Sequence, residues 1–295
     1  MKTIATKLHQ NTLGYWEVID KPSESDLEAY YAKKYYQELK GAHQKQYTES
    51  ELAFYNAKVK QRSAMIDNLL PHLPNKTMLD VGCGEGFEIA YFHQKGWKVK
   101  GIDFSSDGML KQNPSCLDYL ETGNIYTLLD KEIKSGAQYS VVWLQNVLEH
   151  VIDPQSLLNQ LKKLVKPGGC AVITVPNDFS DLQVNALETQ KISTPFWVAL
   201  PDHLSYFNAD SLRRLTEFCG WECLSITGDF PIDWFLMNGK SNYIEEKTAG
   251  KSAHHARVAL ENLIDQQPMD KVLKFWQSLA DVGMGRNITA YISPK

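Results

Sequence analysis

Long apolar runs are missing from this chain of 295 residues. No stretch approaches the about 18 apolar residues that a membrane-spanning helix needs, and the first ten residues lack the apolar segment of a secretory signal. The five cysteines are odd in number and form no Cys-x-x-Cys pair, which argues against a disulfide framework and a zinc cluster. We therefore expect a cytoplasmic protein with reduced thiols that does not enter a membrane.

The chain also lacks a strong charge of either sign, internal repeats and low-complexity segments. Its formal net charge is −4, with 22% charged and 43% hydrophobic residues, which is ordinary for a globular protein. Such a weak negative balance provides no general attraction to nucleic acid or to an anionic membrane. A chain of this length can hold one large domain or little more.

The clearest pattern lies at residues 77–86, which read Thr-Met-Leu-Asp-Val-Gly-Cys-Gly-Glu-Gly. The apolar residues Met78, Leu79 and Val81 predict a short buried strand. Three glycines then remove the Cβ atoms from one tight turn, so the backbone there can approach a ligand closely, and the following helix presents free N–H groups. An ordinary strand-to-helix turn is the structural alternative.

An acidic residue follows at the end of the second expected strand. Asp103 closes the apolar-rich run 97–102, where a carboxylate can accept hydrogen bonds from both ribose hydroxyls of a nucleoside. Dinucleotide-binding folds need the spacing Gly-x-Gly-x-x-Gly, whereas this chain has Gly-x-Gly-x-Gly with Asp80 just before it. Because a carboxylate at Asp80 would repel a pyrophosphate, we expect an adenosine-type ligand that carries an ammonium group.

At these residues the chain resembles the class I S-adenosylmethionine-dependent methyltransferases, and among them the small-molecule type, similar to ubiquinone- and sugar-type enzymes. A second group of motifs follows in the order found in that family: Val-Leu-Glu-His-Val from Val147, Lys-Pro-Gly-Gly from Lys166 and Val-Pro-Asn from Val175. The resemblance covers residues 45–228. Because two separate groups of motifs lie in register, the resemblance is specific.

The resemblance implies an α/β fold with a doubly wound, seven-stranded, mostly parallel sheet, the Rossmann-like methyltransferase fold. The alternation of strand and helix patterns from residue 77 onward also predicts a parallel sheet. We expect core strands at 78–81, 97–102, 117–120, 139–144, 170–175, 222–227 and 288–292. We expect helices at 26–40, 48–71, 86–95, 154–166, 209–219, 252–265 and 269–281, and a short strand within 14–19.

Three parts are expected along the chain. Residues 1–72 form an N-terminal helical lid, in which capping boxes at Ser25 and Thr48 open two helices. Residues 73–228 form the S-adenosylmethionine-binding α/β core. Residues 229–295 hold a helical cap insertion and the final strand of the core sheet, and we expect the insertion to close over the substrate opposite the N-terminal helices. A packing or dimer-forming element is the alternative for the insertion.

The resemblance further implies which residues bind S-adenosyl-L-methionine and its product S-adenosyl-L-homocysteine. At the methionine end, Asp80 and the backbone of Gly82 and Gly84 hold the amino group. Gln145, at the end of the fourth strand, offers a backbone carbonyl to the same amino group. The methyl transfer itself requires no metal.

At the adenosine end, the resemblance implies that Asp103 binds the ribose and that Phe104 lies against the adenine. Asn124 and Ile125 lie at the edge of the adenine. The family often has an aspartate at the position of Asn124, and the asparagine oxygen can still accept a hydrogen bond.

Two of the eight histidines lie where the substrate is expected, His150 after the fourth strand and His203 after the fifth. A histidine titrates near neutrality, so either one can act as the catalytic base for an alcohol acceptor. Alternatively, they fix the loops or only bind substrate, since a carboxylate or phosphate-type acceptor needs no base. Some quinone O-methyltransferases carry Glu-x-x-Glu-His, which resembles a metal-assisted site. Here Asn146 takes the first of these positions, so we expect no metal.

We therefore predict an enzyme that moves a methyl group from S-adenosyl-L-methionine to a small-molecule acceptor, an oxygen of a sugar-, nucleotide- or polysaccharide-linked metabolite. Arg286, in a turn before the last strand, is either a solvated arginine or a contact for an anionic group of that substrate. The protein is expected to act as a monomer or homodimer, with neither nucleic acid nor a membrane as partner. Two alternatives remain open: a methyltransferase of protein or RNA, and a non-catalytic S-adenosylmethionine-binding partner protein.

Overall fold

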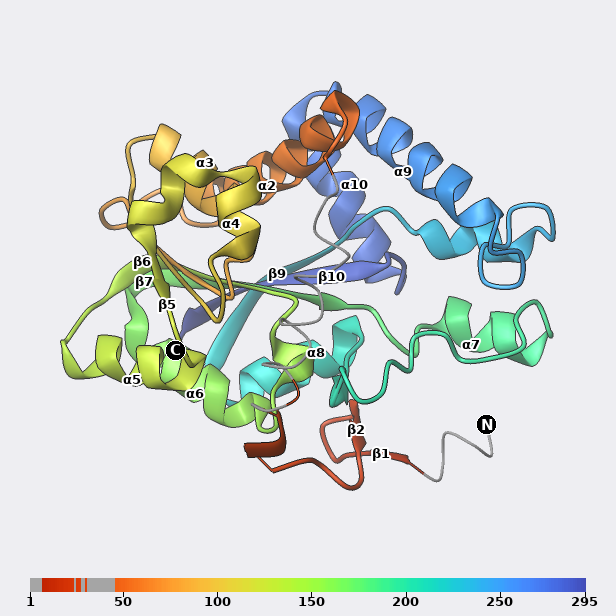
Figure 1. The fold of residues 1–295 in the computed structure, drawn as a ribbon, viewed down its shortest axis with the longest axis horizontal. Coiled ribbons are helices and arrows are strands. Elements are labelled where there is room, and N and C mark those ends of the chain that lie inside the picture. The colour runs from red at the N-terminus through yellow and green to blue at the C-terminus, as the bar shows by residue number, and fades with distance from the viewer. Residues whose placement is uncertain (1–6, 24, 28–29, 31–45) are drawn as a thin grey trace.

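The computed structural model describes residues 7–23, 25–27, 30 and 46–295 of the chain. At its centre lies a seven-stranded sheet in the order β5-β4-β3-β6-β7-β10-β9 (Figure 1). Its strands are β3 (Thr77–Val81), β4 (Lys98–Asp103), β5 (Leu120–Thr122), β6 (Tyr139–Gln145), β7 (Val165–Pro176), β9 (Trp221–Gly228) and β10 (Asn287–Pro294). Neighbouring strands from β5 to β7 pair in parallel, and β10 pairs antiparallel with β7 and β9. The predicted α/β sheet is confirmed.

Helices cover both faces of this sheet (Figure 1). One face carries α2 (Glu49–Leu69), α3 (Phe87–Gln94) and α10 (Met269–Asp281), and the other carries α5 (Ile125–Lys134), α6 (Pro154–Leu164) and α8 (Ala209–Phe218). The side chains of β6 alternate between the faces. Val141 and Trp143 are buried in the hydrophobic core under α2 and α3, and Val142 and Leu144 are buried in the core under α5, α6 and α8. A strand buried on both faces needs such a continuous apolar run, which is why the sequence revealed it.

Shorter helices follow the carboxyl ends of three strands. They are α4 (Asp107–Gln112) after β4, η2 (Leu148–His150) after β6 and α7 (Asp181–Glu188) after β7. In an open α/β sheet, ligands bind at this edge, so these connections surround the expected site. None of the helices that the structure describes is both long and apolar enough to span a membrane.

Helix α2 begins with the capping box that the sequence predicted. Thr48 Oγ1 accepts the Glu51 N–H at 3.2 Å, and Glu51 Oε2 accepts the Thr48 N–H at 2.9 Å. These reciprocal bonds satisfy two backbone donors that the start of a helix leaves open. The other helix predicted for the lid, at 26–40, falls largely outside the described residues.

Two boundaries differ from the prediction. The third core strand starts at Leu120, whereas Pro114–Tyr119 form the 3-10 helix η1 with Pro114 at its start. The fixed φ of proline suits the first turn of a helix, so the residues before the strand take a helical turn. β7 starts at Val165, inside the range predicted for a helix, because this β-branched residue pairs with Tyr139 of β6.

A second sheet of three strands lies beside the core. Its strands are β1 (Leu8–Gln10), β2 (Trp16–Val18) and β8 (Ser205–Tyr206), in that order. The short strand predicted within 14–19 is therefore present as β2. Because Glu17 pairs with Ser205, the N-terminal segment reaches the loop that carries His203.

The insertion between β9 and β10 contains η3 (Ile232–Met237), α9 (Ala249–Asp265) and α10, so both helices predicted there are present. Its helices pack on α2: Asn262 Nδ2 donates to the Ser50 carbonyl at 2.9 Å, and Trp276 Nε1 donates to Gln61 Oε1 at 2.9 Å. Helix α2 thus lies beside the insertion, whereas the sequence analysis placed the N-terminal helices opposite it. The division into lid, core and cap stays a prediction.

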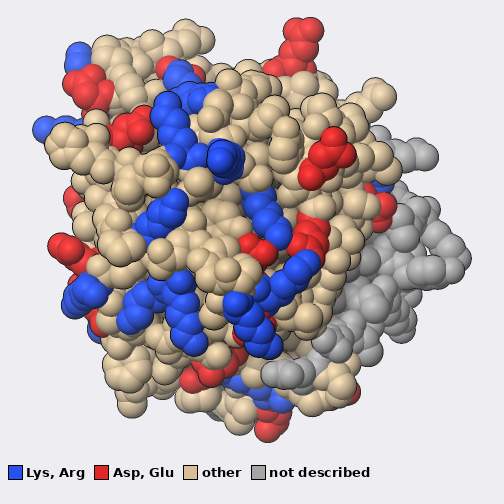
Figure 2. Space-filling model, turned by 90° about the vertical axis from the view of Figure 1, so that its left-hand side faces the viewer, with Lys and Arg blue, Asp and Glu red and all other residues tan. Residues whose placement is uncertain are grey.

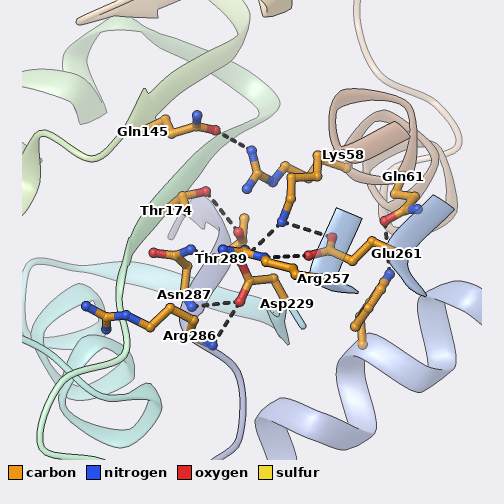
Figure 3. A network of polar contacts seen from close by, with 12 residues as sticks. Lys58, Gln61, Gln145, Thr174, Asp229, Arg257, Glu261, Arg286, Asn287 and Thr289 are labelled. Atoms are coloured by element: carbon orange, nitrogen blue, oxygen red, sulfur yellow. Dashed lines mark hydrogen bonds and ion pairs between the residues drawn. The ribbon is translucent and has the colours of Figure 1, made fainter. Parts of the chain in front are cut away.

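A buried network of charges holds the insertion to α2 and to the sheet (Figure 3). Asp229, the residue after β9, accepts the backbone N–H groups of Arg286 at 2.9 Å and Asn287 at 2.8 Å. The same carboxylate lies 3.1 Å from Lys58 of α2 and 2.5 Å from Arg257 of α9. Although burial acts to raise it, the pKa of Asp229 is held below its ordinary value by these two cations.

Basic side chains, with acidic ones among them, gather on the face shown in Figure 2. The C-terminus, where antiparallel β10 ends, lies toward this side of the molecule (Figure 1), so this is the edge at which the parallel strands begin. Helices α5 and α6, which lie on the same side in Figure 1, carry Lys131, Lys134, Lys162 and Lys163 in their last turns. Because cations at helix C-termini are stabilised by the helix dipole, these lysines have a structural explanation.

Replacing Asp229 by asparagine should lower the free energy of unfolding by about 3 kcal/mol, because Lys58 and Arg257 lose their shared counter-charge. Urea unfolding near neutral pH measures this change. Since the folded-state pKa of Asp229 is lowered, its stabilisation is present above the ordinary carboxyl pKa and is lost as the pH falls through the folded-state value. Asp281→Asn, at an exposed aspartate in the last turn of α10, is the matched control; equal stabilities of the two variants would contradict this role of Asp229.

Candidate active site

The glycine loop joins β3 to α3 at the carboxyl edge of the sheet. Gly82 and Gly84 have φ values of +74° and +49°, which glycine adopts without strain. A Cβ atom at Gly82 would lie 2.5 Å from Val147 Cγ2, so the turn also needs the missing side chain. At Gly84 an added Cβ would meet no atom of the described residues within 4 Å. The loop therefore borders open space, where a ligand can approach the backbone.

Asp103 is held against this loop at the end of β4. It is 7% exposed, its Oδ2 accepts the Gly84 N–H at 2.8 Å, and its Oδ1 accepts the Ser105 N–H at 3.1 Å. Burial raises the pKa of Asp103, and these backbone N–H groups act in the opposite direction. The next residue, Phe104, is 36% exposed. A fixed carboxylate followed by a partly exposed aromatic ring suits a ribose and an adenine.

Asp80 and Glu88 are buried near the same loop. Asp80 is 1% exposed, and its Oδ2 has no hydrogen-bond partner among the residues that the structure describes. Burial, together with the charges of Glu88 and Asp103, raises the pKa of Asp80 well above its ordinary value. Because three carboxyl groups share this small region, a positively charged group of a ligand would be stabilised there.

Arg62 of α2 is a residue at this site that the sequence analysis missed. Its Nη1 contacts Gln145 Oε1 at the end of β6 and lies 4.0 Å from Glu88 Oε1. Only 11% of the side chain is exposed, so the guanidinium is enclosed between the end of β6 and the buried carboxyl groups. In the sequence, Arg62 lies among lysines and glutamines and looks like part of a solvated helix face, so no local signal marked it.

The structure places Asn124 and Ile125 at the start of α5, close to Asp103. Gly123 donates its N–H to the Asp103 carbonyl at 2.9 Å. Asn124 Oδ1 accepts the Thr127 N–H at 3.2 Å and so caps the helix. The side chain of Ile125 is buried at 8% exposure. Helix capping gives Asn124 a structural reason to occupy this position, and the roles of both residues toward an adenine stay predictions.

The two histidines singled out in the sequence come together in the structure. The rings of His150 and His203 meet edge to face, with centroids 4.8 Å apart. His150 Nδ1 lies 2.8 Å from the Asp202 carbonyl. Because a carbonyl only accepts, Nδ1 carries the proton, and the Nε2 of a neutral ring keeps a lone pair. The His150 side chain is 25% exposed, so an acceptor molecule can reach it.

Glu149 is buried beside these histidines. It is 1% exposed, its Oε2 has no hydrogen-bond partner within the described part of the chain, and its Oε1 lies 3.8 Å from His150 Nε2. Burial raises the pKa of Glu149 to about 8, so the carboxyl group is mostly protonated near neutral pH. Atoms of Glu149, His150 and His203 that could ligate a metal lie within 4.8 Å of one another. The sequence offered Glu149 and His150 as the last two residues of a metal-assisted motif but did not connect His203 with them, and the expectation of no metal stays a prediction.

Comparison with known proteins identifies the family. Residues 55–226, more than half of the chain, match the sequence model of a methyltransferase domain. The chain belongs to the class I S-adenosylmethionine-dependent methyltransferases. The resemblance seen in the sequence is thereby confirmed, and the cofactor of this methyltransferase is S-adenosyl-L-methionine. The partnerless oxygen of Asp80 fits the ammonium group of that cofactor.

Similar proteins include the ubiquinone biosynthesis O-methyltransferase of Vibrio atlanticus, which is 30% identical over 159 residues, 52% of this chain and 66% of that protein. The protein of the same name from Hydrogenovibrio crunogenus is 36% identical over 108 residues, 36% of this chain and 44% of that protein. The methyltransferase thus spans less than two thirds of the length of these relatives. A solved S-adenosylmethionine-dependent methyltransferase from Archaeoglobus fulgidus is 17% identical, with a TM-score of 0.47, over 80% of this chain and 94% of that chain.

Replacing Glu149 by glutamine should change the stability of this methyltransferase little near pH 5 and raise it near pH 8. The raised folded-state pKa means that the stability associated with the protonated carboxyl is present at low pH. It is lost as the pH rises toward about 8, because the unfolded chain ionises freely. Urea unfolding at both pH values measures the effect, with Glu188→Gln at an exposed position of α7 as control. A variant whose stability falls with pH as steeply as that of the wild type would disprove it.

Proposed function

We propose that the protein transfers the methyl group of S-adenosyl-L-methionine to an oxygen atom of a small molecule, of the sugar-, nucleotide- or polysaccharide-linked kind. The observation that carries the proposal is the buried Asp103 bound to Gly84, with the partnerless Asp80 at the same loop. The names of the similar Vibrio and Hydrogenovibrio proteins, ubiquinone biosynthesis O-methyltransferases, support oxygen as the accepting atom. The bound cofactor supplies an electrophilic methyl group, so the protein has to align an acceptor and exclude water.

At the methionine end, the two charges of the cofactor find opposite charges in the protein. Asp80 receives the ammonium group, together with the backbone of the glycine loop and the carbonyl of Gln145. Arg62 receives the carboxylate, because its guanidinium lies at the end of β6 and is enclosed, where a charge-assisted hydrogen bond is strong. The ammonium group also offsets the repulsion among the buried carboxyl groups.

At the adenosine end, the groups follow the carboxyl ends of β4 and β5. Asp103 binds the ribose hydroxyls with the lone pairs that its backbone contacts leave over. Phe104 presents its exposed ring to the adenine. Asn124 and Ile125 lie at the adenine edge, next to Asp103 through the Gly123 contact.

On the acceptor side, His150 removes the proton of the acceptor hydroxyl. Its Nδ1 is fixed by the Asp202 carbonyl, so Nε2 is the atom that takes the proton. Glu149 is mostly protonated, but it is too distant from His150 Nε2 for a hydrogen bond. It therefore does not donate its proton to Nε2, which stays able to accept the proton of the hydroxyl. His203 packs against the His150 ring and is a second contact for the acceptor.

Titration calorimetry should show that the protein binds S-adenosyl-L-homocysteine and that Asp103→Ala weakens this binding by about 1–3 kcal/mol, the cost of losing charge-assisted hydrogen bonds. Arg62→Gln should weaken it by a similar amount. Asp118→Ala, at an exposed aspartate in η1, is the matched control and should bind like the wild type. Binding of NAD in place of S-adenosyl-L-homocysteine would refute the assignment of the site.

Methyl transfer can be followed with methyl-labelled S-adenosylmethionine and a bacterial extract separated into small-molecule, protein and RNA fractions. Label should enter the small molecules, and His150→Asn should slow transfer by about 10²–10⁴-fold, the usual contribution of a general base, while binding of S-adenosyl-L-homocysteine is retained. His72→Asn, at an exposed histidine before β3, is the control. Label in protein or RNA alone would favour the macromolecular alternative, and an unchanged rate in His150→Asn would exclude this base.

A further inference from the structure

Arg286 lies on the acceptor side of the site without a role in binding the cofactor. It precedes β10, and its carbonyl accepts the Asn177 N–H at 2.9 Å just past the end of β7. In Figure 3 its side chain points away from Asp229, although its backbone N–H binds that carboxylate. The backbone is thus anchored in the buried network, while the guanidinium extends beyond the ends of the strands.

The guanidinium is oriented by one carboxylate and keeps donors to spare. Its Nη1 lies 3.1 Å from Asp178 Oδ1. The Nε and Nη2 atoms of Arg286 make no hydrogen bond to any residue that the structure describes, and 23% of the side chain is exposed. Arg257 differs, because its Nε and Nη2 bind the carboxylates of Glu261 and Asp229. Arg286 therefore has the geometry of a positioned cation that can still bind an anion in two places.

The acidic groups around Arg286 lie behind it. Asp178, Asp233 and Glu149 are 1%, 3% and 1% exposed, whereas the side chains of Arg286 and His150 are 23% and 25% exposed. Asp233 already accepts hydrogen bonds from two neutral side chains. A molecule that enters here meets the guanidinium, which Asp178 positions, and the imidazole, which the Asp202 carbonyl positions.

We propose that Arg286 binds an anionic group of the acceptor, a carboxylate or a phosphate, and thereby selects acceptors that carry one. This inference rests on the proposed function, since it concerns the acceptor of the same site. The Phe196 ring centroid lies 5.7 Å from Cζ of Arg286 and provides an apolar wall beside the cation. Arg286 thus binds the anionic group of the acceptor, while His150 faces the hydroxyl group of the acceptor.

When an acceptor anion binds, the Arg286 guanidinium has to exchange part of its contact with Asp178 for a contact with the anion, and the protonation of Asp178 makes this exchange feasible. Burial raises the pKa of Asp178 to about 6, and Arg286 acts to lower it. The other charged groups that bear on this pair are Asp233, next to Arg286, Glu149, which responds to both members of the pair, and Arg257, which repels Arg286. When an acceptor anion takes over part of the guanidinium, Asp178 can bind a proton instead of remaining as an uncompensated buried charge.

The test uses four probes that share a phenyl ring: phenylacetate, phenyl phosphate, 2-phenylethanol and 2-phenylethylamine. Their dissociation constants are measured by ligand-observed NMR on the full chain saturated with S-adenosyl-L-homocysteine. The two anions should bind about tenfold or more tightly than 2-phenylethanol, and the amine should bind most weakly, because a hydrogen bond between charged groups contributes on this scale. The order of the two anions tells which of them, carboxylate or phosphate, the site prefers.

Variants assign the preference to Arg286. Arg286→Gln alone leaves Asp178 without its partner, so the double variant Asp178→Asn, Arg286→Gln is also made, in which this ion pair is removed whole and Asp233 keeps its hydrogen bonds from Gln183 and Tyr243. Both should lose the preference for anions, Arg286→Lys should keep part of it, and Arg213→Gln on α8 should keep all of it. Each variant should retain the wild-type affinity for S-adenosyl-L-homocysteine.

The assignment is overturned if the four probes bind equally, if none binds, if the amine binds most tightly, or if the double variant keeps the preference for anions. A failure of the proposed function would look different. In that case the wild type would not bind S-adenosyl-L-homocysteine at all, and the anion preference could still be measured without it.

Discussion

Three carboxyl groups, those of Asp80, Glu88 and Asp103, are buried together where β3 and β4 end. Like charges in a region without water repel one another, so this arrangement requires compensation. The N–H groups of Gly84 and Ser105 supply part of this compensation to Asp103. Arg62 supplies another part to Glu88. The remaining oxygen of Asp80 is left for a cation, and we propose that the ammonium group of the cofactor takes that place.

The need for compensation also explains why the N-terminal helix and the C-terminal insertion belong to the site. Arg62 reaches the carboxyl groups from α2, and α2 is held in turn by the insertion through Lys58 and Asp229. Asp229 also binds the backbone of Arg286 and so fixes the start of β10. Helix α2 therefore links two groups of buried charges, one around Glu88 and one around Asp229, although their members come from distant parts of the chain.

Most of the fold was predictable because it follows from local patterns. Apolar runs that end in glycine or an acid marked β3 and β4, the unbroken apolar run 141–144 marked β6, and the capping box at Thr48 marked α2. Predictions failed where the signal is weak: at η1, where Pro114 favours a helical turn, and at Val165, where pairing with β6 decides. The position of α2 beside α9 was missed because helix packing depends on contacts between residues some 200 positions apart, as with Asn262 and Ser50.

The sequence by itself determined the family, the glycine loop with its flanking acids and the presence of a histidine after each of two neighbouring core strands. These follow from residue type and spacing within single strand–loop–helix units, which fold alike wherever they occur. Only the tertiary structure decided that Arg62 reaches Gln145, that His150 and His203 meet, and that Arg286 is a positioned cation instead of a solvated one. The physical reason is that burial and charge compensation are properties of neighbours in space, and these neighbours lie on separate elements of the chain.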